Sequence, residues 1–228
     1  MDEVKKIYND EKLLVRAMDF PKLKNGIDGL EYDCTTWANE FCMLMNGTLS
    51  SISTTLIIPN VGVSTYKSIG FLINSDLANC FHISKSDSSS SGNINDGDFL
   101  ANKPDFQTIS ELANYIKTNN ATTMNEVNIN ASIDSVKGLF FNKCARQDLL
   151  VQMIYVVRTC LKMITEVEYP IYSYDINNGK LTYMELSYEL EQQIIQSLKS
   201  NNLFYWPDEY EEPIIDKIEN ARTHTVKH

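Results

Sequence analysis

Hydrophobic residues recur at helical spacing in several parts of the chain and predict about six helices. The longest covers residues 147–165, where apolar residues lie on most sides, so we expect a long central core helix there. A Thr108-x-x-Glu111 pattern, typical of a capping box, predicts a helix that ends near Thr118. The other predicted helices cover residues 2–18, 34–46, 187–200 and 213–221.

Runs rich in β-branched and aromatic residues predict strands between these helices. Residues 126–133 alternate apolar and polar side chains with the period of a strand. The Asn177-Asn178-Gly179 sequence between two such runs is typical of a β-hairpin turn. Further strands are expected at 51–58, 64–74, 80–85, 171–176 and 180–186. Because few β-α-β alternations occur, we expect one α+β domain, residues 1–228, with a mixed or antiparallel sheet.

Two polar stretches change this picture. Residues 86–97 are serine-rich and too polar to pack, so we expect a mobile surface loop there. Residues 185–219, the acidic C-terminal segment, hold nine acids and two bases, and nine minus two leaves a net charge of −7. Such a segment either is a solvated face or steers a basic partner into contact.

The net charge of the whole chain is −10, which disfavours nucleic acid and anionic membranes as partners. The N-terminus has no apolar region of a signal peptide, and the longest apolar run is too short to span a membrane. The five cysteines show no C-x-x-C spacing and mostly neighbour apolar residues. We therefore expect a soluble cytoplasmic protein in a reducing compartment.

The last quarter of the chain combines aromatic residues with carboxylates. Aromatic side chains anchor protein interfaces, and acids supply long-range attraction to a cation. The sequence therefore suggests a binding protein for a basic protein partner, with the profile of a bacterial immunity protein that masks a toxin. The candidate binding residues are Trp206, Asp208, Glu209, Tyr210, Glu211 and Glu212.

An alternative function depends on Cys34, which falls in the first turn of a predicted helix. A helix N-terminus favours the thiolate form, and His82 is the candidate base, with Asp98 or Asp105 to orient it. Cysteine at a helix start, then histidine on a strand, then a carboxylate resembles the arrangement in papain-like hydrolases. This resemblance covers about Gly29 to Asp105 and implies a cysteine-nucleophile hydrolase or transferase.

No motif indicates a cofactor. The chain lacks the glycine-rich motifs that bind nucleotides and the nucleophile-elbow motif of hydrolases. His224 and His228 have the spacing of metal ligands, but they end the chain and no third ligand is evident nearby. The stretch from Asn93 to Asp98, aligned to a calcium loop with Gly97 at the sixth position, fails that pattern at three ligand positions. We therefore predict no cofactor and no metal.

Overall fold

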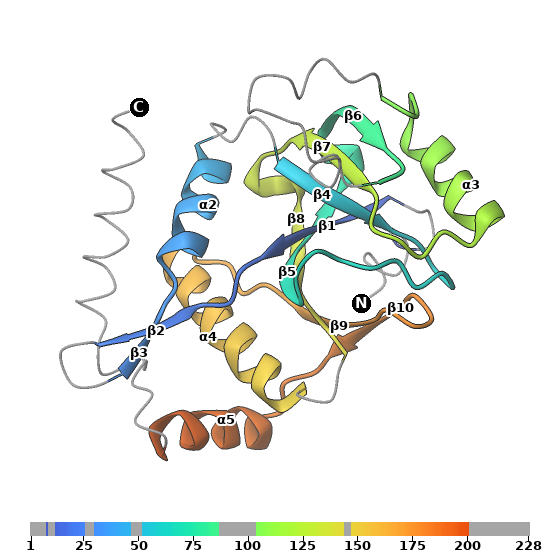
Figure 1. The fold of residues 1–228 in the computed structure, drawn as a ribbon. Helices are drawn as coiled ribbons and strands as arrows, with labels where there is room; N and C mark the ends of the chain where they lie inside the picture. Colours follow the sequence, from blue (N-terminus) through green and yellow to red (C-terminus); the bar gives the residue numbers. More distant parts are fainter. Residues whose placement is uncertain are drawn as a thin grey trace.

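The computed structural model describes residue 8 and residues 12–25, 30–46, 52–86, 104–143 and 147–200. These residues form a mixed α+β structure around an eight-stranded sheet (Figure 1). The strands are β1 (Leu13–Met18), β2 (Lys22–Asn25), β3 (Leu30–Asp33), β4 (Ile52–Ile57), β5 (Ile69–Asn74), β6 (Asn79–Ser84), β7 (Glu126–Asn130), β8 (Val136–Asn142), β9 (Ile171–Asp175) and β10 (Lys180–Met184). The α-helices are α2 (Thr35–Met45), α3 (Ile109–Asn119), α4 (Gln147–Thr165) and α5 (Tyr188–Ser200).

The large sheet has the strand order β10-β9-β8-β5-β1-β4-β7-β6. Among the strands that the structure describes, only β8 and β9 run parallel, and β2 and β3 pair separately as a two-stranded sheet. Helices α2 and α4 lie side by side, and α5 lies next to α4 (Figure 1). Trp37 and Phe41 of α2 contact Phe71 of β5 edge to face, so α2 covers the middle of the sheet. Helix α3 lies beside β6 at the opposite end of the molecule (Figure 1).

The prediction of a helix over residues 2–18 is wrong for residues 13–18, which form a strand in the middle of the sheet. Residues 13–18 form β1, which pairs with β4 on one side and β5 on the other. Leu13, Leu14 and Val15 are at most 1% exposed. A strand buried on both faces has consecutive apolar residues, and such a run also satisfies the helical period. Residues 2–7 and 9–11 lie outside the described residues.

The expected number of helices is also wrong. The described residues contain four α-helices instead of about six: residues 13–18 of the first predicted helix form a strand, and the last predicted helix is not among these residues. The predicted helix at 213–221 and residues 87–97 of the predicted loop lie outside the described residues. The residue pattern did not predict β8 or the pair formed by β2 and β3. Strand β8 contains Gly138, which weakens a strand pattern, and β2 and β3 lie in the interval between the helices predicted at 2–18 and 34–46.

Several local predictions are confirmed. Helix α3 begins with the expected capping box, in which Thr108 and Glu111 each bind the backbone of the other. The long helix α4 covers residues 147–165 as predicted. Strands β9 and β10 form the expected hairpin, with Gly179 at φ +67° in its turn. A Cβ atom at Gly179 would lie 2.4 Å from the carbonyl oxygen of Val61, so this position requires glycine on two grounds.

Candidate functional site

Cys34 lies directly before α2, at the N-cap position, and its side chain is 6% exposed. The thiol makes no capping hydrogen bond, and the carboxylate of Asp33 accepts the Thr35 N–H at 2.9 Å instead. Burial raises the pKa of Asp33, but hydrogen bonds from Thr35 and Lys24 lower it by more, so it falls below its ordinary value. The residue before the buried Cys34 therefore carries an ionised carboxylate, which is bound to Thr35 and Lys24.

The structure does not bring Cys34 and His82 together. Cys34 begins α2, which packs on β5 through the contacts with Phe71. His82 lies on β6, four strands away from β5, which is about 19 Å at about 4.8 Å per strand. Figure 1 shows the start of α2 near β3 and β6 at the other end of the molecule. The cysteine hydrolase alternative gains no support from this geometry.

Of the two candidate orienting carboxylates, the structure describes Asp105, which binds Lys85. One carboxylate oxygen of Asp105 accepts the backbone N–H of Lys85 at 3.0 Å, and the other lies 3.5 Å from its ammonium group. Asp98 lies outside the described residues. His82 instead places Nε2 2.9 Å from the hydroxyl oxygen of Ser84 on the same strand.

Four polar side chains are buried on one face of β6 and β7. His82 pairs with Asn128 and Ser84 with Glu126, and opposite residues of an antiparallel pair share a face. All four are at most 8% exposed. The amide nitrogen of Asn128 has no hydrogen-bond partner among the described residues. The alternation of apolar and polar residues in β7 is visible in the sequence. The sequence does not indicate that the polar residues Glu126 and Asn128 are buried as well.

A cavity of about 220 Å³ opens where β1 and β4 separate. Arg16 lies at this point, and one of its terminal nitrogens donates to the carbonyl of Ser53 at 3.1 Å. Its Nε donates to the Glu40 carboxylate at 2.6 Å, so the positive charge is already paired. The polar residues that line the cavity are Arg16, Ser53, Thr54, Thr55, Tyr66, Asn125 and Glu126. The only cation in this lining is therefore not available to a bound anion.

Aromatic and acidic side chains are exposed together on β10 and the start of α5. Tyr183 is 40% and Tyr188 72% exposed, and Glu185 and Glu189 are exposed beside them. Hydrogen bonds from its own backbone N–H and from Ser187 lower the pKa of Glu189 and favour its charged form. We refer to Tyr183, Glu185, Tyr188 and Glu189 as the β10–α5 surface.

A groove of about 360 Å³ adjoins this surface between α4, α5 and β10. Its apolar lining consists of Val151, Met184, Leu190 and Ile194. Its polar lining comes from three glutamines and Asp148, whose side chain is exposed. The groove therefore combines an apolar floor with a negative charge at one end.

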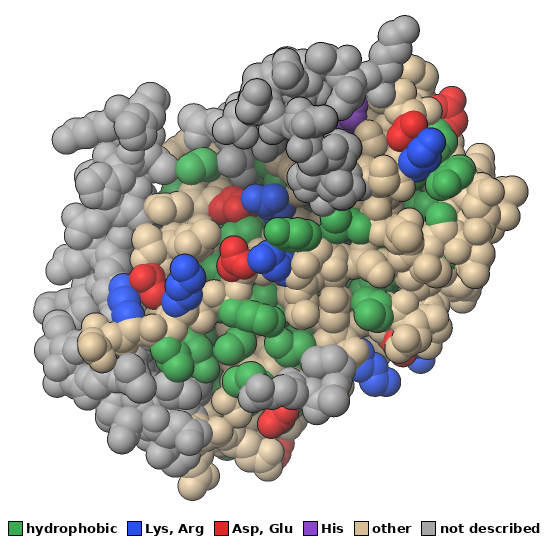
Figure 2. All heavy atoms as spheres, in the orientation of Figure 1, with side chains coloured by type: hydrophobic (Ala, Val, Ile, Leu, Met, Phe, Trp, Pro, Cys, Tyr) green, Lys and Arg blue, Asp and Glu red, His purple; other side chains and the backbone are tan. Residues whose placement is uncertain are grey.

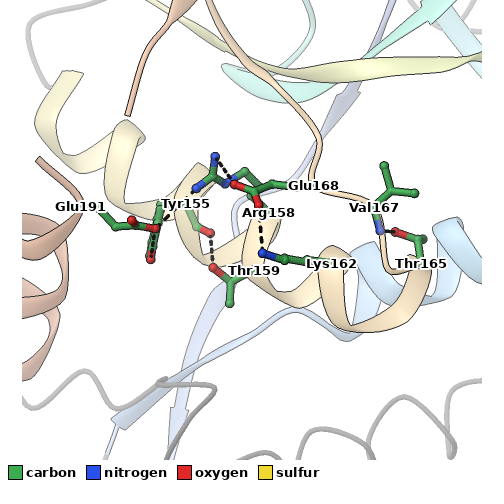
Figure 3. Close-up of polar contacts among 8 residues, drawn as sticks. All are labelled: Tyr155, Arg158, Thr159, Lys162, Thr165, Val167, Glu168 and Glu191. Carbon is green, nitrogen blue, oxygen red and sulfur yellow. Dashed lines mark hydrogen bonds and ion pairs between the residues drawn. The ribbon is translucent and has the colours of Figure 1, made fainter. Parts of the chain in front are cut away.

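Helix α5 is held on α4 by a group of charged residues (Figure 3). The guanidinium of Arg158 lies 3.2 Å from the carboxylate of Glu168 and 3.6 Å from that of Glu191. The Tyr155 hydroxyl donates to Glu191 at 2.9 Å, and Lys162 pairs with Glu168 at 2.8 Å. Glu191 therefore faces α4 and fixes α5, unlike the exposed Glu185 and Glu189.

Many acids elsewhere on the described surface form ion pairs. On the face seen in Figure 2, acidic side chains lie next to basic ones. The pairs outside the α4–α5 contact are Lys12–Asp76, Arg16–Glu40, Lys24–Asp33, Lys67–Asp19 and Lys85–Asp105. Neither Glu185 nor Glu189 forms an ion pair with any described residue. Their charges are therefore not neutralised within this part of the chain.

The residues predicted to bind a partner lie beyond this surface along the chain. Trp206, Asp208, Glu209, Tyr210, Glu211 and Glu212 are outside the described residues, as are His224 and His228. Within the described ranges, no group of three or more His, Cys, Asp or Glu residues could hold a metal ion. None of the described helices combines the length and the hydropathy needed to cross a membrane.

Comparison with known proteins assigns no family. No protein-family model matches the chain, and no curated protein matches its sequence.

Proposed function

We propose that the protein is a binding protein that engages a basic protein partner through the acidic C-terminal segment, residues 185–219. The main support is the β10–α5 surface, where Glu185 and Glu189 are exposed and form no ion pair with described residues. Unpaired acids attract a cationic partner over a distance, and the exposed rings of Tyr183 and Tyr188 offer contact area. An inhibitor that masks a basic active site, as an immunity protein does, has this profile.

The rest of the acidic segment has two roles in this proposal. Trp206 and Tyr210 supply aromatic anchors, and the acids between and after them extend the negative field. The net charge of −7 on the segment, out of −10 for the chain, makes it the main source of that field.

The same charge disfavours nucleic acid as a partner. The free thiols of Cys34, Cys42, Cys80 and Cys160 fit a reducing compartment, for which we propose the cytoplasm.

The proposal is tested by neutralising the acids without removing side-chain volume. One variant carries Asp208→Asn, Glu209→Gln, Glu211→Gln and Glu212→Gln. A control with the same net charge carries Asp19→Asn, Asp76→Asn, Asp134→Asn and Glu166→Gln, all exposed and outside the segment. Stopped-flow association with a fluorescent oligolysine measures the on-rate over a range of salt concentrations.

We expect the segment variant to associate about tenfold more slowly than the wild type and with a flatter salt dependence. The control should keep most of the wild-type rate. Equal rates for the two variants would show that net charge alone matters and would contradict the proposal. The wild type and the two variants can also be used as baits in an extract of the native host. We expect the wild type and the control to retain more of the natural partner than the segment variant does.

A further inference from the structure

The two edges of the eight-stranded sheet differ in how they are covered. At β6, the backbone N–H of Phe106 donates to the carbonyl of Ile83 at 3.2 Å. Just beyond β6, the N–H of Lys85 donates to the Asp105 carboxylate at 3.0 Å. At β10, residues 181–184 pair with β9, and no backbone hydrogen bond to a described residue lies on the other side. Among the described residues, β10 is therefore the open edge.

Strand β10 has few of the features that usually protect an edge. Proteins block edge strands with proline, bulges or charged side chains, because unpaired backbone groups accept further strands. Residues 180–184 contain no proline, and their pairing with β9 runs without a register shift. Lys180 is the only charged residue in the strand, and it lies at the turn. The part of β10 from Leu181 to Met184 is thus a regular strand that can pair again.

The charges around this edge determine which kind of strand it accepts. Glu185 follows β10 directly, Glu189 lies in the first turn of α5, and Asp148 lines the adjoining groove. Asp175, which pairs with Lys180 in the ladder, has its pKa lowered, mainly by the backbone N–H of Asn177. A second copy of the chain would bring its own net charge of −10 and be repelled. An extended segment rich in lysine or arginine would be attracted.

We propose that the basic partner adds an extended segment to β10 and thereby continues the sheet. Alternate residues of β10 direct their backbone N–H and C=O groups away from β9, and these groups bind the added strand. The basic side chains of that strand face Glu185 and Glu189, and its apolar side chains contact Tyr183. This inference rests on the proposed function, because it specifies how the acidic surface holds its partner.

The test uses the whole protein and two synthetic peptides of equal charge. The first alternates lysine and valine, which favours an extended strand. The second has the same sequence with the alternate backbone nitrogens that would face β10 methylated, which removes their N–H donors, obstructs strand pairing and keeps the charge. Fluorescence anisotropy measures both affinities, and amide hydrogen exchange reports on Leu181, Thr182, Tyr183 and Met184.

We expect the unmethylated peptide to bind at least about tenfold more tightly and to slow exchange in β10. The variant Glu185→Gln/Glu189→Gln should weaken binding of both peptides, whereas the distant control Asp134→Asn/Glu166→Gln should not. Equal affinities with no protection of β10 would overturn strand addition and leave the acidic binding surface standing. Failure of both peptides to bind would overturn the inference, and a missing response to oligolysine would then overturn the proposed function as well. A dimer in sedimentation equilibrium without peptide, with β10 already protected, would assign the edge to a second copy and also overturn it.

Discussion

At the scale of single residues, two asparagines near each other in sequence show how burial and hydrogen bonding differ. Asn125 is 2% exposed, and its amide group binds both backbone groups of Leu56, at 2.8 and 3.0 Å. Asn128 is 1% exposed, yet its amide nitrogen has no partner among the described residues. A buried amide stabilises a fold only when its groups are paired. The two side chains therefore contribute unequally to stability.

This difference predicts unequal effects of the same substitution. Asn125→Ala should lower the free energy of unfolding by about 2–4 kcal/mol, because it leaves the buried N–H and C=O of Leu56 unpaired. Asn128→Ala should cost about 1 kcal/mol or less, because it removes an amide nitrogen that is already unpaired. Urea denaturation of both variants measures the difference. Equal losses would mean that Asn128 has a role in stability that its contacts do not show.

At the scale of elements, the position of α5 depends on polar contacts as well as on apolar packing. Ile194 and Ile195 are buried, but Leu190 is only partly buried, so the apolar contact of the described helix is narrow. Glu191 adds a hydrogen bond from Tyr155 and an ion pair with Arg158, whose side chain is 14% exposed. Partly buried pairs of this kind contribute more than exposed ones. We infer that Glu191 orients α5 and with it the β10–α5 surface.

Removal of that carboxylate should loosen α5 before it affects the rest of the fold. We expect Glu191→Ala to raise amide hydrogen exchange in residues 188–197 by about tenfold, with little change in the central strands. The neighbouring exposed residue gives a matched control, Gln192→Ala, which should leave exchange unchanged. If exchange in α5 were unaltered in both variants, apolar packing alone would hold the helix.

At the scale of the whole molecule, two buried tyrosines join distant parts of the chain. The Tyr8 hydroxyl donates to the carbonyls of Ile58 and Gly179, and Tyr174 exchanges hydrogen bonds with both backbone groups of Val63. Burial raises the pKa of both tyrosines, and the nearness of Tyr174 raises that of Tyr8 further. The folded state therefore keeps these protons at a pH where the unfolded chain has lost them.

The sign of this linkage predicts alkaline destabilisation. A tyrosine in the unfolded chain ionises near its ordinary pKa of 10.0, so above this pH the unfolded state holds fewer protons. The free energy of unfolding should then fall by about 1.4 kcal/mol per pH unit for each of the two tyrosines. Urea denaturation between pH 8 and 11 measures the slope. Tyr8→Phe/Tyr174→Phe should flatten it, whereas Tyr66→Phe, at a site that is 66% exposed, should not.

The sequence by itself determined the elements whose signals are local. The capping box of α3, the apolar faces of α4 and α5 and the turn residues of the β9–β10 hairpin act within a few positions of the chain. The uneven charge that supports the proposed function is likewise visible in the order of residues along the chain. These features can be identified without knowing which residues pack against them.

Only the tertiary structure decided what depends on partners distant in sequence. Leu13 to Met18 is a strand because β4 and β5 pair with it on both sides, and its own pattern cannot show this. Cys34 and His82 suit a catalytic pair by residue type, but Cys34 begins α2, which packs on β5, and His82 lies on β6, about 19 Å from β5 at the usual strand spacing. Likewise, β10 is an edge only because the sheet ends there. Strand order is fixed by long-range contacts, and local residue patterns do not encode it.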